Sequence, residues 1–190
     1  SIIDKGHLVL FVHVPDLVDH LRSTFHPTSE TSYSELFEQS RNTLKNGKAN
    51  NPLEVCVESE SQSGFASRIN VRDFELTIDQ PHSFGGTNKG PKPSEVLLAS
   101  LAACQEVTWR LYAAANGIPL TSIRVKLKGI QDLRGFLSID DEISAGFQKI
   151  TGIIKIESPA SADKISHLKE IVDSHCPVLD DLRRPVSVDL

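Results

Sequence analysis

The sequence predicts an α+β protein, because its strands and helices follow one another without a regular βαβ alternation. Three patterns support this class. Several segments alternate apolar and polar residues, as strands with one buried face do. The stretch LLASLAACQEVTWRLYAAA, residues 97–115, is the most apolar helical segment. The expected order is a strand-rich part, one long helix, two strands, a shorter helix and a final strand.

The first 50 residues have a pattern of their own. HLVLFVHV, residues 7–14, is a short apolar run with β-branched residues and predicts a buried strand. Pro15 or Asp16 is a suitable start for a helix through residue 25. A second helix is expected in SYSELFEQSRNTLK, residues 32–45.

The turn-forming stretch NGKANNP, residues 46–52, marks the expected boundary. It separates an N-terminal extension, residues 1–50, from a domain at residues 53–190. The extension is expected to pack as an arm on a dimer. A lid over the site and an unrelated interaction segment are the alternatives.

Strands of the domain are predicted from alternation and from β-branched residues. LEVCVESES (53–61) and FASRINVRDFELTID (65–79) precede the long helix and should pair antiparallel, because their connections are short. SIRVKLKG (122–129) and GFQKITGIIKIES (146–158) follow it, and PVSVDL (185–190) is expected to be the final strand.

Two helices of the domain have recognisable ends. HSFGGTNKGPKP is rich in glycine and proline and predicts a loop, after which Ser94 is expected to cap a helix that opens at Glu95. That helix should end at Asn116-Gly117. SADKISHLKEIVDSH, residues 161–175, has its apolar residues at helical spacing and predicts an amphipathic helix.

Composition excludes several classes of function. The 190 residues are 39% hydrophobic and 24% charged, with a formal net charge of −5. No basic cluster is present, so neither a nucleic acid nor an anionic membrane is an expected partner. No apolar run is long enough to span a membrane, and the first ten residues lack a signal-peptide pattern. A soluble, cytoplasmic protein is therefore expected.

The three cysteines are Cys56, Cys104 and Cys176. So small and odd a number does not predict a secreted disulfide scaffold. Neither a CxxC nor an HExxH motif occurs, so no metal site is expected. Cys56 alternates with apolar neighbours in a predicted strand, and no chemistry is assigned to it.

Cys104 lies in the middle of the long helix, and Cys176 lies at a chain turn before Pro177. A reactive cysteine needs its thiolate form. The helix dipole has little effect more than two turns inside a helix, so a nearby cation would have to stabilise the Cys104 thiolate. An inert, buried cysteine is the alternative for this position.

The segments GGTNKGPKPSEVLLASLAAC, RLYAAANGIPL, RGF, GFQKI, IESPAS and HCPV resemble the OsmC/Ohr family, and more closely its broad OsmC-like branch. The resemblance covers about residues 53–190. It implies an intertwined homodimer, with an antiparallel sheet of each subunit wrapped around the long central helices. It also implies an antioxidant thiol peroxidase that reduces organic hydroperoxides without a resident cofactor and depends on an external dithiol.

By position, the resemblance assigns Cys104 as the peroxidatic cysteine and Cys176 as the resolving one. The Ohr pattern has a glutamate ten residues before the peroxidatic cysteine, paired with an arginine. Here that position is Ser94, and Glu95 lies nine residues before Cys104.

Arg68 is the nearest candidate for the arginine, and Arg72 follows it. Leu97, Leu98, Leu101 and Trp109 would suit an organic substrate as a lining, or would pack in the core.

Two other functions remain open at this point. The first is a non-catalytic binding protein that holds an apolar ligand at the dimer interface. It would follow from Ser94 standing in the glutamate position and from the absence of an assured arginine. The second is a structural or regulatory dimer whose N-terminal segment binds a partner.

Overall fold

The computed structural model describes residues 2–4, 7–13, 32–47 and 52–190. The chain forms two compact units, Ser1–Asn42 with Leu101–Leu190, and Thr43–Ser100. The predicted α+β class is confirmed, with antiparallel strand pairs and helices in both parts of the chain. The helix expected between residues 15 and 25 lies outside the described residues. The division into an extension at 1–50 and a domain at 53–190 stays a prediction.

The first unit contains a four-stranded sheet with the order β1-β2-β7-β6. Its strands are β1 (Ile2–Asp4), β2 (His7–His13), β6 (Ser122–Gln131) and β7 (Phe147–Ser158). The β1–β2 and β6–β7 pairs are antiparallel, whereas β2 runs parallel to β7. The strand predicted at residues 7–14 therefore exists and belongs to the same sheet as the two strands that follow the long helix.

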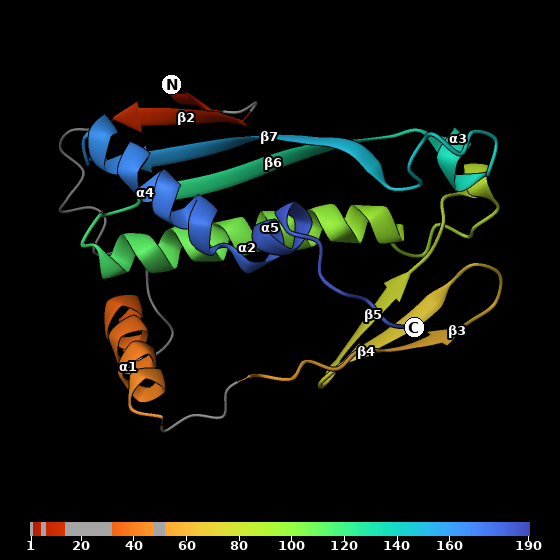
Figure 1. Cartoon of the computed structure of the whole chain (residues 1–190), viewed down its shortest axis with the longest axis horizontal. Coiled ribbons are helices and arrows are strands. Elements are labelled where there is room, and N and C mark those ends of the chain that lie inside the picture. The colour runs from red at the N-terminus through yellow and green to blue at the C-terminus, as the bar shows by residue number, and fades with distance from the viewer. Residues whose placement is uncertain (1, 5–6, 14–31, 48–51) are drawn as a thin grey trace. The chain divides into compact units, whose positions relative to one another are not determined.

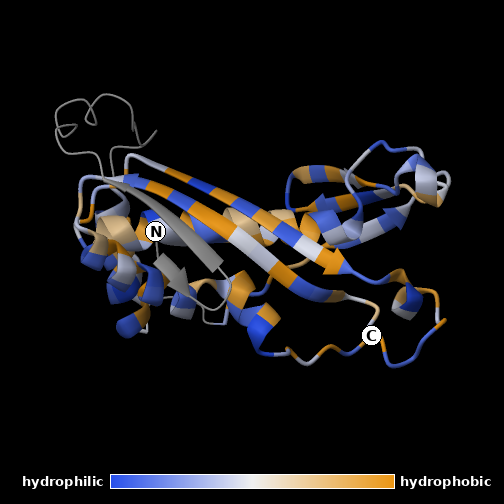
Figure 2. Cartoon of the chain, turned by 90° about the horizontal axis from the view of Figure 1, so that it is seen from above, coloured by the Kyte–Doolittle hydropathy of each residue, from blue (hydrophilic) through white to orange (hydrophobic). Residues whose placement is uncertain are grey.

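Apolar and polar residues alternate along strands β6 and β7, because one face of these strands packs on the helices. Figure 2 shows the alternation as successive orange and blue bands along these two long strands. Ile154 and Ile156 of β7 are buried two residues apart, and exposed Lys155 lies between them. Opposite them, Val125 of β6 pairs with Ile154. The sheet therefore presents a continuous apolar face to the core.

Three elements share this core. They are β7, the long helix α2 (Pro93–Ala115) and the helix α4 (Ala162–His175). Figure 1 shows β6 and β7 running along α2, with α4 beside them. Trp109 of α2 and Leu168 of α4 are completely buried. The full cluster is Trp109, Ala113, Ile154, Ile156, Ile165, Leu168 and Val172. Burial of these side chains fixes α4 against α2 and thereby positions the end of α4.

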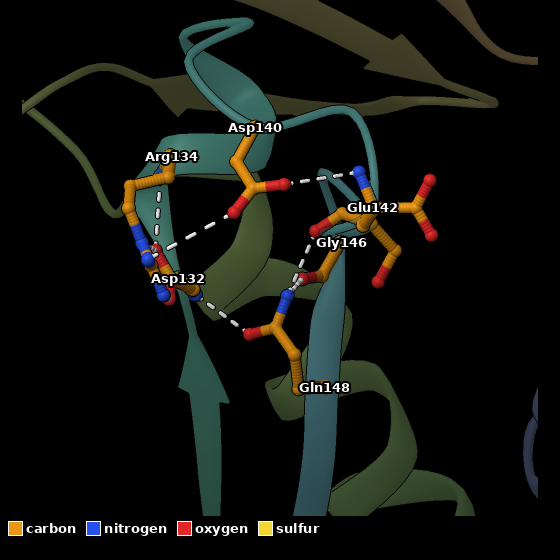
Figure 3. A network of polar contacts seen from close by, with 7 residues as sticks. Asp132, Arg134, Asp140, Glu142, Gly146 and Gln148 are labelled. Atoms are coloured by element: carbon orange, nitrogen blue, oxygen red, sulfur yellow. Dashed lines mark hydrogen bonds and ion pairs between the residues drawn. The ribbon is translucent and has the colours of Figure 1, made fainter.

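The connection between β6 and β7 is built around a short helix, α3 (Leu133–Phe136). Asp132 caps it by accepting a 3.0 Å hydrogen bond from the backbone N–H of Arg134, and it also pairs with the Arg134 guanidinium. Figure 3 shows this pair together with Asp140, and shows Gln148 holding the backbone of Gly146 and Asp132. The Arg134 side chain lowers the pKa of Asp132 to about 2. These contacts join the two ends of the connection between β6 and β7.

The N-terminal helix predicted at residues 32–45 is α1 (Tyr33–Lys45). Its start has the expected chemistry, because the hydroxyl of Ser32 accepts from the backbone N–H of Glu35 while the Glu35 carboxylate accepts from the backbone N–H of Ser32. No residue of α1 is buried, and Leu36 and Leu44 are about half exposed.

The second unit contains the three-stranded antiparallel sheet β3-β4-β5. Its strands are β3 (Glu58–Ser61), β4 (Ser67–Val71) and β5 (Phe74–Ile78). A short 3-10 helix, η1 (His82–Phe84), opens the loop that leads to α2. The prediction of antiparallel strands with short connections is confirmed here.

Two strand predictions are wrong. Residues 53–57 form no strand, because β3 pairs with β4 only from Glu58 onward, opposite Asn70, and β4 ends at Val71. The apolar side chains of the alternating segment, Leu53, Val55 and Val57, are exposed.

Residues 185–190 also form no strand. They follow a short helix that begins after Cys176, α5 (Pro177–Arg183). Pro177 occupies the first turn of this helix, where a missing N–H is tolerated.

Candidate functional site

Helix α2 begins two residues earlier than the sequence predicts, at Pro93 rather than Glu95, and Ser94 lies inside it. Pro93 is its first residue, and the backbone carbonyl of Lys92 accepts from the N–H groups of Glu95 and Val96. The Glu95 carboxylate accepts a 3.0 Å bond from the backbone N–H of Lys92. This contact is the glutamate half of a capping box. The prediction of Ser94 as the cap is therefore wrong, because Pro93 already has the fixed φ of a helix start.

The loop before α2 is held by one buried carboxylate that the sequence analysis did not single out. Asp79 is 1% exposed and accepts hydrogen bonds from the Thr87 hydroxyl and from the backbone N–H groups of Gln80, Thr87 and Lys89. These bonds, the Thr87 hydroxyl foremost, lower the pKa of Asp79 to about 2. The signal in the sequence is a lone aspartate at the end of a strand before a glycine-rich loop.

Cys176 lies where α4 ends and α5 begins. Its N–H donates to the carbonyl of Val172 in α4, and its carbonyl accepts from the N–H of Asp180 in α5. The backbone of Cys176 is extended, with φ −79° and ψ 111°, so the chain changes direction at this residue. The side chain is completely buried. The sequence prediction of a turn at Cys176 is confirmed.

The structure brings Cys104 and Cys176 together. Their sulfur atoms are 3.4 Å apart, with the Cys176 thiol donating toward the Cys104 sulfur, and both cysteines are free. Burial raises the pKa of the Cys176 thiol, and the neighbouring Cys104 raises it further. Cys104 is partly exposed, whereas Cys176 is not. The two thiols therefore differ in access to solvent although they are in contact.

Gln105, the residue after Cys104, is buried with its side-chain amide unsatisfied. It is 4% exposed, and among the described residues neither its oxygen nor its nitrogen has a hydrogen-bond partner. The amide nevertheless lies near enough to Cys176 to lower the pKa of that thiol, although no full hydrogen bond joins them. The sequence analysis missed Gln105, and its only signal was a polar residue on the face that also carries Leu101 and Trp109.

A small cavity adjoins Gln105. Its volume is about 20 Å³, and its polar lining is Gln105, Lys169, Asp173 and Arg183. The Lys169 Nζ atom, on a side chain that is 7% exposed, lies 2.7 Å from a carboxylate oxygen of Asp173. The Arg183 guanidinium lies 3.9 Å from the same oxygen. Asp173 of α4 thus pairs with Lys169 of the same helix and with Arg183 of α5, and the second pair holds α5 against α4 close to Cys176.

The other predicted site residues have structural contacts of their own. Glu95 binds the backbone of Lys92 and lies nine residues before Cys104, about 13 Å along the helix axis. Arg68 belongs to the second unit, where its guanidinium pairs with Glu60 on the neighbouring strand.

Arg72 lies in the turn between β4 and β5, with its guanidinium over the ring of Phe74. Cys56 is exposed, and its thiol points to Glu54 at 3.7 Å. Cys56 is therefore not one of the two contacting cysteines, and the Arg72 guanidinium contacts Phe74.

The expected apolar lining divides between core and surface. Trp109 is completely buried and Leu101 is 4% exposed, so both pack in the interior. Leu97, by contrast, is 40% exposed. Val107, at a position that shares a helix face with Cys104 and Leu97, is 55% exposed. The face of α2 that carries Cys104 therefore exposes Val107 one turn after the cysteine and Ser100 one turn before it.

Within the described part of the chain, no three His, Cys, Asp or Glu side chains gather as metal ligands. No helix among the same residues is both long and apolar enough to cross a membrane.

Comparisons with known proteins identify the family. The chain is 27% identical over 137 residues to an uncharacterized protein of Haloferax volcanii, covering 72% of this chain and 93% of the relative. It is 28% identical over 111 residues to a hydroperoxide reductase of Mycoplasma genitalium, covering 58% of this chain and 73% of that protein.

The crystal structure of an OsmC-like protein from Mycoplasma pneumoniae has the same fold. It aligns with a TM-score of 0.63 at 23% identity, covering 70% of this chain and 90% of the other. The model of the OsmC-like protein family matches residues 86–190, which include both contacting cysteines. With more than half of its residues matched by that model, the chain belongs to the OsmC-like protein family.

Proposed function

We propose that this protein is a thiol peroxidase that reduces organic hydroperoxides through Cys104 and Cys176. The observation that carries the proposal is the 3.4 Å contact between the two sulfur atoms within the part of the chain that matches the family. The relationship to a hydroperoxide reductase supports the reaction class. The exposed Val107, on the face of α2 that carries Cys104, supports an organic rather than an inorganic peroxide.

The geometry favours Cys104 as the sulfur that reacts first. Cys104 is reachable from solvent, whereas Cys176 is buried and burial raises its pKa, which keeps its proton in place. The Cys104 thiolate attacks the terminal oxygen of the hydroperoxide. The O–O bond breaks, the rest of the substrate leaves as an alcohol after taking a proton, and Cys104 becomes a sulfenic acid.

The second step uses the contact already present. The Cys176 sulfur attacks the Cys104 sulfur, a disulfide forms, and the sulfenic oxygen leaves as water with the thiol proton of Cys176. An external dithiol then reduces the disulfide and restores both thiols, so no resident cofactor is required.

We propose that the working form is a homodimer, as the family resemblance implies. Apolar side chains are exposed on α2, at Leu97 and Val107, and in the segment before β3, at Leu53, Val55 and Val57. Contact with a second subunit would remove the apolar surface of these side chains from water. Glu95 and Arg68 remain candidates for a contribution to the peroxidatic site in such an assembly.

A binding protein for an apolar ligand is the second candidate, because the carboxylate of Glu95 and the guanidinium of Arg68 are each engaged elsewhere. Equal ligand affinity in Cys104→Ala, without any oxidation of the thiols by hydroperoxide, would favour it.

Turnover of cumene hydroperoxide in the presence of excess dithiothreitol tests the peroxidase proposal. Cys104→Ser should abolish turnover, and Cys56→Ser, which removes the exposed cysteine outside the pair, should retain it. Full turnover in Cys104→Ser would rule the proposal out.

A further inference from the structure

The buried amide of Gln105 requires an explanation. Its two polar atoms are buried and have no partner in the part of the chain that the structure describes, although buried amide groups in folded proteins are nearly always hydrogen-bonded. A leucine or methionine would fill the same space beside Leu101 and Trp109 without this cost. The amide is therefore expected to gain a partner when the charge on a neighbouring group changes.

Two candidates lie next to this amide. One is the Cys176 sulfur, which lies 3.4 Å from the sulfur of Cys104, the residue before Gln105, and whose pKa the amide lowers. The other is the cavity of about 20 Å³ that Gln105 lines together with Lys169 and Asp173. This volume accommodates about one water molecule, which needs two to four polar partners. The amide can therefore bind a sulfur atom on one side and a water molecule on the other.

Chemistry at Cys176 changes during the proposed reaction. Cys176 is buried and protonated in the resting state, yet it must attack as a sulfur nucleophile in the second step. Negative charge that develops on a buried sulfur needs hydrogen-bond donors, since water does not reach it. The backbone N–H of Leu179 lies near the sulfur on the α5 side, and Leu179 also lines the cavity. The Gln105 amide is the second available donor.

We propose that the Gln105 side-chain nitrogen donates a hydrogen bond to the Cys176 sulfur while that sulfur attacks oxidised Cys104, and that the Gln105 oxygen accepts from a water molecule held in the cavity beside Lys169 and Asp173. The inference rests on the proposed peroxidase function and deepens its resolving step. The Cys176 proton goes to the leaving oxygen, so Gln105 moves no proton and stabilises only the developing charge.

A titration tests the hydrogen bond without any peroxide chemistry. In the Cys56→Ser/Cys104→Ser protein, Cys176 is the only thiol, and its ionisation is followed by thiolate absorbance in the ultraviolet. Adding Gln105→Leu should raise the Cys176 pKa by about one unit, the effect of losing one hydrogen bond to a charged group. An unchanged titration would overturn the proposal.

Two further variants make this result specific. Gln105→Met keeps an unbranched side chain and should give the same shift if the leucine variant folds poorly. Trp109→Phe removes another buried N–H, which has no partner among the described residues and lies one turn further along the same helix face, and it should leave the Cys176 titration unchanged. A shift of equal size in Trp109→Phe would show that loosening of the helix face causes the effect, and would overturn the proposal.

Rapid-mixing kinetics test whether Gln105 acts in the step that forms the disulfide. In a chain with all three cysteines, Gln105→Leu should consume the first equivalent of hydroperoxide at the parent rate. It should form the disulfide about tenfold more slowly and accumulate a sulfenic acid that a dimedone probe traps.

Normal hydroperoxide consumption with an unaltered rate of disulfide formation would overturn the role of Gln105 and leave the proposed function standing. The parent protein could also fail to consume hydroperoxide while Gln105→Leu still shifts the Cys176 titration. That result would overturn the proposed function and the catalytic role of Gln105, but it would support the hydrogen bond between Gln105 and Cys176.

Discussion

Oxidation of the cysteine pair should stabilise the protein against unfolding by an amount set by the separation of the two residues in the chain. Cys104 and Cys176 are 72 residues apart, and their sulfur atoms are already in contact in the reduced protein. Closing a loop of this length removes conformational entropy from the unfolded chain and is worth about 4 kcal/mol at 25 °C. The folded state moves little, because the sulfur atoms need to approach by only about 1.4 Å to reach disulfide length.

Guanidinium unfolding of the reduced and oxidised forms measures this difference. Both forms should be compared at equal protein concentration, because assembly of subunits also shifts the midpoint. For a chain of this size the corresponding increase in Tm is about 10 °C.

Cys176→Ser is the matched control, since it cannot form the bond and should show no difference between the two conditions. Equal midpoints for the reduced and oxidised parent would refute the reasoning, as would an increase that persists in Cys176→Ser.

Three further predictions concern the loop before α2 and the core of the first unit. Gly90→Ala should lower the free energy of unfolding in urea by about 1–3 kcal/mol, because the added Cβ would lie 2.1 Å from a backbone oxygen. The control Gly146→Ala should leave this free energy unchanged, because its added Cβ would have no atom within 4 Å. Asp79 has a pKa of about 2, below its ordinary 3.8, so its stabilising effect is complete above about pH 4 and is lost as the pH falls toward 2. Asp79→Asn should therefore be less stable at pH 7 and lose this part of the acid transition, and an unchanged acid transition would contradict the assignment. Leu168→Ala, at a completely buried position, should lower the free energy of unfolding in urea by about 2–5 kcal/mol, while a loss below 1 kcal/mol would contradict its place in the core.

Much of the architecture follows from local patterns in the sequence. The long helix, the strands β4 to β7 and the helix α4 were predicted because each has its own periodicity and its own stop signals. The contact between Cys104 and Cys176 was expected only through the family resemblance, since residues 72 positions apart meet through the packing of α4 on α2. Local sequence patterns do not predict a contact between residues so far apart in the chain.

The predictions that failed have separate physical causes. Alternation in residues 53–57 and in 185–190 is compatible with a strand, but a strand also needs a neighbouring edge, and within the described chain neither segment has one. Ser94 is a good capping residue by type, yet Pro93 and Glu95 set the helix start by backbone geometry and by a side-chain bond. Gln105 was missed because a single polar residue in an apolar helix shows its importance only when its partners are known.

The most direct test of the central claim is to map the disulfide bonds by mass spectrometry after one equivalent of cumene hydroperoxide. The reduced protein should lose two hydrogen atoms per chain and yield one cross-linked peptide pair that contains Cys104 and Cys176, with Cys56 still free. Free thiols at Cys104 and Cys176 after the peroxide has been consumed, or a cross-link that involves Cys56 instead, would contradict the account.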